Sequence, residues 1–205
     1  PMLRKALEQA GLSHIPAISL SSGLETTPGF SMSFNLLDRC LKALVYGDLL
    51  QQLLLRTRPY EKLQGAAEGA YQACLTLCKE IIRSGSRRDY RESFAQIVRR
   101  FDELPCLPRT RPRVGIVGEI LVKFHPMANN HLIDFLEKEG AEAVLPDFTS
   151  FLLYCAYDKK VRYDLLSGSW MEKLSGLSFI KMIEWYRRDM KKALSDSQHF
   201  LSPPS

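Results

Sequence analysis

The segment Arg111–Asp147, RPRVGIVGEILVKFHPMANNHLIDFLEKEGAEAVLPD, decides the fold class of this chain. It opens with a short apolar strand around Val114–Val117 and continues into helical spacing over Asn129–Glu139. Gly140 then suits a helix end with positive φ, and Ala143–Leu145 begins a second strand. Two strands joined by a crossover helix normally run parallel, so the segment predicts one β-loop-α-β unit.

The rest of the sequence predicts helices around this unit, and therefore an α/β fold with a large helical portion. We expect a few-stranded parallel sheet of Rossmann-like βαβ type. Residues 1–110 would form a strand plus helical subdomain, and residues 111–205 the βαβ lobe with C-terminal helices. The further elements predicted are a strand at Ile15–Leu20 and helices at Met2–Ala10, Phe34–Arg56, Ala66–Arg83, Arg91–Leu104, Phe148–Tyr157 and Ser178–Leu194. So few strands suggest an internal fragment, one lobe of a larger protein.

Composition limits the classes of function. The 205 residues are 45% hydrophobic, enough for a sizeable core, and the net charge of +5 is modest. The basic clusters Arg83–Arg91 and Arg109–Arg113 flank turns and lack aromatic interleaving, which favours solvated loops over a nucleic-acid partner. No apolar run reaches the roughly 18 residues that span a membrane. Five irregularly spaced cysteines indicate reduced thiols, and we expect a cytoplasmic protein.

Glu119 follows the first predicted strand of the unit, at the carboxyl edge where α/β sheets usually bind ligands. A carboxylate there is costly to bury without a partner. It therefore reaches solvent, pairs with Lys123 or an arginine, or points into a cleft. We treat it as a candidate pocket residue beside a structural alternative, an ion pair or helix cap.

The loop before the predicted helix concentrates side-chain donors, with His125, Asn129, Asn130 and His131 close together. One asparagine should cap the helix, and the same helix start could hold an anion. The second asparagine and His125 would then remain for a ligand. The two histidines do not have a recognised metal-ligand spacing, and Gly115-x-x-Gly118 is not a dinucleotide-binding fingerprint.

The cysteines give one candidate metal ligand. Cys155 follows the second strand of the unit, and the helix that carries it could return it to the sheet edge. Cys74 and Cys78 share a helix face and, like Cys40 in an apolar stripe, are expected in the core. No Ser–His–Asp set, Walker motif or HExxH sequence is present, so the catalytic residues are unknown and the isolated chain is expected to be inactive.

Three charged residues outside the unit receive structural predictions. Asp48 sits in VYGDL, which suggests a helix end, and Arg58 in TRPYE suggests a surface position or a local pair with Glu61. Arg187 falls on the polar side of the last predicted helix and is expected in solvent. The preceding FTSFLLYCAY segment is apolar on nearly every side, which predicts a buried helix with Asp147 as its N-cap.

Several segments together resemble the 2-hydroxyacyl-CoA dehydratase D-component superfamily, and within it the large proteins related to CoA-substrate-specific enzyme activases. The similar segments are VGIVGE, the HPMANN loop with EGAEAVLPDF after it, TRPYE and the upstream order IPAISL, SSGLE, TTPGF. The similarity runs over most of the chain and is specific at VGIVGE and TRPYE. This chain has His125 where the family pattern has asparagine.

The resemblance implies ATP-coupled, low-potential electron transfer. An ATP-dependent activator would pass an electron to a component with an iron–sulfur cluster, [4Fe-4S] or related, which acts on an acyl-CoA or other small molecule. Glu119, His125, Asn129 and Asn130 would then line the cluster or substrate pocket. Cys155 would be the one candidate ligand here, since the family's other cluster cysteines are expected outside this sequence. The alternatives are a non-catalytic lobe that docks a partner or binds a small anion.

Overall fold

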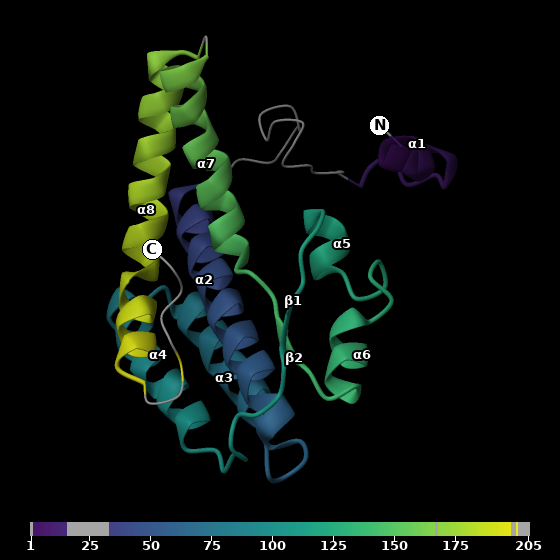
Figure 1. Cartoon of the computed structure of the whole chain (residues 1–205). Coiled ribbons are helices and arrows are strands. Elements are labelled where there is room, and N and C mark those ends of the chain that lie inside the picture. Colours follow the sequence, from purple (N-terminus) through teal and green to yellow (C-terminus); the bar gives the residue numbers. More distant parts are fainter. Residues whose placement is uncertain (1, 16–32, 167, 198–199, 201–205) are drawn as a thin grey trace. The chain divides into compact units, whose positions relative to one another are not determined.

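A computed structural model describes residues 2–15, 33–166, 168–197 and 200 of the chain. The chain forms two compact units, Pro1–Cys40 and Leu41–Ser205. The domain boundary predicted between residues 110 and 111 instead separates a strand plus helical subdomain from the βαβ lobe, and it stays a prediction. Most described residues are helical, with one small parallel sheet, so the coarse α/β prediction is confirmed (Figure 1).

The first unit contains the helix α1 (Met2–Gln9) and the first turns of α2 (Phe34–Thr57). Both helices were predicted within one residue of these bounds. The predicted strand Ile15–Leu20 falls almost wholly on residues 16–20, which lie outside the described residues. Cys40 was expected in the core and is exposed, so that prediction was wrong.

The second unit is built on the rest of α2, followed by η2 (Arg58–Tyr60), α3 (Ala66–Ser84) and α4 (Arg87–Asp102). Tyr46 of α2 packs against Tyr90 and Phe94 of α4, with ring centroids 5.1 and 5.2 Å apart. The helix α4 begins four residues before its predicted start because the Ser86 hydroxyl accepts a hydrogen bond from the Asp89 amide at 3.1 Å. These aromatic contacts form part of the core of this unit.

The parallel sheet consists of β1 (Arg113–Gly115) and β2 (Glu142–Val144), in the order and direction that the sequence predicts. Between them lie α6 (Leu132–Lys138), whose end has Gly140 at a φ of +87°, and an unpredicted short helix, α5 (Ile120–Phe124). Figure 1 shows α5 and α6 on the same side of the strand pair. Val117 was predicted in the strand core and is exposed instead, while Ile116 is buried.

The chain then forms α7 (Phe148–Leu165) and α8 (Trp170–Ser195), which lie side by side as a hairpin (Figure 1). The helices touch closely at Gly176, where an added Cβ would lie 2.6 Å from the Ala156 carbonyl oxygen. The expectation of a buried α7 was wrong, because Tyr154 and Tyr157 are exposed. The helix α8 begins eight residues before its predicted start, at a capping box.

Among the described residues, no helix is long and apolar enough to cross a membrane.

Candidate functional site

Glu119 is the N-cap of α5. Its carboxylate accepts a hydrogen bond from the Val122 amide at 3.0 Å, and the residue is exposed. An acidic side chain at this position satisfies one of the free amides at the helix start and suits the positive end of the helix dipole. The structure thus places Glu119 beside solvent, in the role of a cap.

Asn129 joins α5 to α6. Its side-chain amide donates hydrogen bonds to the carbonyl oxygens of Val122 and Lys123, at 3.0 and 3.2 Å. Its side-chain oxygen accepts a bond from the Leu132 amide at 3.2 Å, at the start of α6. His131 occupies the N-cap position of α6 without a side-chain cap bond, so the capping that was predicted for an asparagine comes from Asn129, two residues earlier, and both polar ends of its side chain are used within the protein.

His125 and Asn130 lie in the same loop and are exposed. The His125 carbonyl accepts hydrogen bonds from the amides of Ala128 and Asn129, at 2.9 and 3.2 Å, which closes the turn after α5. Asn130 and His131 both have a φ of +54°, a left-handed conformation that asparagine tolerates better than most residues. The structure thus gathers the four candidate pocket residues around α5 and the loop after it.

Cys155 lies on α7 and is exposed. Iron–sulfur clusters are held mostly by sets of cysteine thiolates. The other cysteines do not form such a set, since Cys74 and Cys78 are buried on α3 while Cys40 and Cys106 are exposed elsewhere. Among the residues that the structure describes, no group of three or more His, Cys, Asp or Glu could hold a metal ion. These residues do not fit a cluster site.

A buried charge cluster that sequence reasoning missed lies just beyond β2. The two carboxylate oxygens of Asp48, in the middle of α2, accept hydrogen bonds from the Phe148 and Thr149 amides, each at 2.8 Å. Asp48 therefore caps α7 from a helix 100 residues away in sequence. Asp147 makes no side-chain cap bond; instead its carboxylate pairs with Arg187 at 3.1 Å.

Arg187 is the most buried charged residue of this cluster, with 1% of its surface exposed. The prediction that it points into solvent was wrong, because its side chain is buried and pairs with Asp147 at 3.1 Å and with Glu184 at 3.2 Å. Burial raises the pKa of Asp147 to about 6; the charge of Asp48 adds to the rise and Arg187 opposes it. Burial also raises the pKa of Asp48 above its usual value.

A second missed network fixes the sheet to the helices. Glu142, in β2, is 1% exposed; it accepts a hydrogen bond from the Tyr60 hydroxyl at 2.9 Å and one from Arg113 at 3.1 Å. Arg58 was expected on the surface or in a local pair. It instead makes a two-pronged pair with Glu137 of α6, at 2.7 and 3.0 Å.

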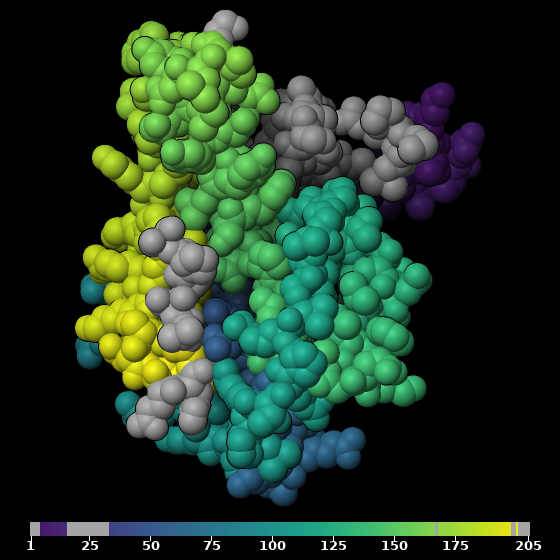
Figure 2. Space-filling view, in the orientation of Figure 1, coloured from purple at the N-terminus to yellow at the C-terminus, as the bar shows by residue number. Residues whose placement is uncertain are grey.

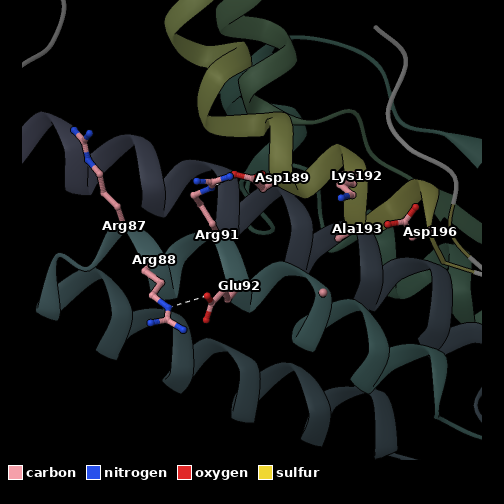
Figure 3. A pocket seen from close by; sticks show the side chains of 9 residues that line it. Arg87, Arg88, Arg91, Glu92, Asp189, Lys192, Ala193 and Asp196 are labelled. Atoms are coloured by element: carbon pink, nitrogen blue, oxygen red, sulfur yellow. Dashed lines mark hydrogen bonds and ion pairs between the residues drawn. The ribbon is translucent and has the colours of Figure 1, made fainter.

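A groove of about 720 Å³ runs between α4 and α8 (Figure 3). Arg88 lies beside Glu92 at 2.9 Å, and Arg91 reaches across to Asp189 at 3.2 Å. In Figure 3, Arg87 points away from these pairs, and it stacks over the Trp185 ring at 5.5 Å. Basic and acidic side chains therefore alternate along the groove and pair with one another, as on a solvated surface.

The chain matches no protein-family model, and no curated protein or solved structure is significantly similar to it.

Proposed function

We propose that this chain is a lobe of a 2-hydroxyacyl-CoA dehydratase-type, ATP-coupled iron–sulfur reductase system, and that it docks the ATP-dependent activator. The proposal draws its biochemical setting from the VGIVGE and TRPYE resemblances. The proposal includes a Rossmann-like sheet to which the observed pair of parallel strands belongs, and a cytoplasmic location for the protein. Within that setting, the geometry favours a docking role over a complete cluster or substrate pocket.

The observation that carries the docking role is a group of exposed apolar side chains around α5. Val117, Leu121 and Met127 are 85%, 65% and 78% exposed. Val122 and Phe135 are also exposed, on α5 and α6. Figure 2 shows this teal-to-green region at the surface of the second unit. Large exposed apolar patches are typical of protein interaction sites, and we call these five residues, which belong to α5, α6 and the loops beside α5, the α5 face.

The alternatives have less support from the described residues. A cluster or acyl-CoA pocket would need free ligand groups, while Glu119 and Asn129 are engaged in capping. In this proposal, a [4Fe-4S] cluster is held mainly by cysteines that do not belong to this sequence, and Cys155 contributes at most one ligand. A small-anion site at the start of α6 would compete with Asn129 for the Leu132 amide.

Binding of the chain to a dehydratase-type activator tests the proposal. Leu121→Asp places a charge in the α5 face and should weaken binding at least tenfold, while Leu165→Asp, at a leucine on α7 that is also well exposed, serves as the matched control. Circular dichroism of both variants would confirm that they fold. Equal affinities for the two variants would remove the α5 face as the docking surface.

A further inference from the structure

The junction of α2, α7 and α8 holds one carboxylate more than its cations can neutralise. Asp48 and Asp147 bring two negative charges from separate elements, and Arg187 is the cation that faces both of them. The α7 N-terminus adds a partial positive charge of about half a unit. The pair therefore retains an excess negative charge when both carboxyls are ionised.

The neighbouring groups do not cancel this excess. Glu184, also on α8, takes one side of Arg187 at 3.2 Å, and Lys191 is engaged with the other oxygen of Glu184 at 2.7 Å. These two partners neutralise each other. Arg187 Nε is buried without a hydrogen-bond partner, so the cluster is not fully satisfied in this arrangement.

We propose that Asp48 and Asp147 form a proton-binding latch that fastens the start of α7 to α2. In the neutral-pH form both carboxyls are charged and repel each other, and the first turn of α7 is held less tightly than in the protonated form. Uptake of one proton by the pair removes the repulsion. The remaining carboxylate then keeps its hydrogen bonds with the Phe148 and Thr149 amides and its attraction to Arg187, and α7 is held tightly.

The position of the latch gives it a route to the α5 face. The Phe148 ring, whose amide is held by Asp48, packs edge-on against the Phe124 ring of α5 with centroids 5.6 Å apart. A tighter first turn of α7 would therefore steady α5. This consequence for docking rests on the proposed function, whereas the latch itself concerns only the chain and is tested without any partner.

The test is amide hydrogen exchange of Phe148 and Thr149 in the full chain, followed by NMR and corrected for the intrinsic pH dependence of exchange. With midpoints near 6 in the closed form and 3.8 in the open form, protection should rise about 10-fold from pH 7 to pH 5. Asp147→Asn mimics the protonated residue, and its protection should be high at both pH values. Asp158→Asn, at an exposed residue on the same helix, should behave like the wild type.

A carboxyl ¹³C titration of the wild-type chain keeps the test decisive if a variant fails to fold. The latch predicts that the two carboxyls titrate as a coupled pair with one step near pH 6, and that Asp147→Asn lowers the Asp48 midpoint by more than about one unit. Both carboxyls titrating below pH 4.5, or pH-independent protection of the two amides, would overturn the latch. Loss of activator binding with the titration intact would instead count against the docking proposal alone.

Discussion

Replacing Asp48 by alanine should weaken the second unit more than its sequence context suggests. The carboxylate is 5% exposed and receives two amide hydrogen bonds at 2.8 Å from the first turn of α7. Hydrogen bonds to a charged group are each worth about 1.5–3 kcal/mol, so the gross loss is about 3–6 kcal/mol. The substitution also leaves the part-buried Phe148 amide and the buried Thr149 amide without their acceptor.

One contribution opposes this loss. Removing Asp48 relieves its repulsion of Asp147, the second largest cause of the raised Asp147 pKa after burial. We assign about 1 kcal/mol to this relief, since the whole rise to about 6 is worth roughly 3 kcal/mol and burial accounts for most of it. The net destabilisation expected for Asp48→Ala at pH 7 is therefore about 2–5 kcal/mol.

Urea unfolding followed by circular dichroism measures this free energy, and hydrogen exchange at Thr149 reports whether the first turn of α7 is the part that loosens. Asp158→Ala is the matched control, because Asp158 lies on the same helix in an exposed pair with Arg162. Its cost should stay below about 0.5 kcal/mol. An Asp48→Ala cost below about 1 kcal/mol would refute the reasoning that Asp48 caps α7 across the core.

Three further predictions concern Asp147 and the second network, that of Glu142 and Arg58. The folded-state pKa of Asp147 is raised from 3.8 to about 6, so its contribution to stability is fully present below pH 3.8 and is lost as the pH rises through 6. The stability of the wild type relative to Asp147→Asn should therefore fall by about 2 kcal/mol between pH 4 and pH 7 in urea titrations. A difference that does not change with pH would contradict the raised pKa of Asp147. Arg58→Lys should cost about 1–2 kcal/mol in thermal and urea unfolding, because lysine cannot reproduce the two-pronged contact with Glu137; an unchanged midpoint would mean that the pair is no stronger than an ordinary surface ion pair. Tyr60→Phe should cost about 1.5–3 kcal/mol by removing the hydroxyl that donates to the buried Glu142 carboxylate, and a neutral effect in urea unfolding would show that the network tolerates the loss.

The sequence predicts the features that depend on local order. The parallel strand pair follows from the apolar runs on either side of one helix, and the end of α6 follows from Gly140, whose φ of +87° suits glycine. The asparagine cap also follows from its place just before a helix, although α6 starts at Leu132 and not at Asn129. Five-residue α5 escaped prediction because so short a segment has little periodicity.

The features that sequence reasoning missed depend on contacts between distant segments. Periodicity places Arg187 on the polar side of α8. It is buried instead, where it pairs with Asp147, a residue 40 positions away in the sequence that local periodicity cannot reveal. The sequence around Asp48 suggested a helix end, and the contact was missed because the amides that Asp48 binds belong to α7. The apolar surface of α7 suggested burial, while Tyr154 and Tyr157 are exposed because α8 covers a different side of the helix.

The most direct test of the docking account is the affinity of the wild-type chain for a dehydratase-type activator, measured by isothermal titration calorimetry with ATP and without nucleotide. The account predicts saturable one-to-one binding whose affinity differs at least tenfold between the two conditions, about 1.4 kcal/mol. Binding of equal strength in both conditions, or no binding in either, would contradict the proposal that this lobe docks an ATP-driven partner.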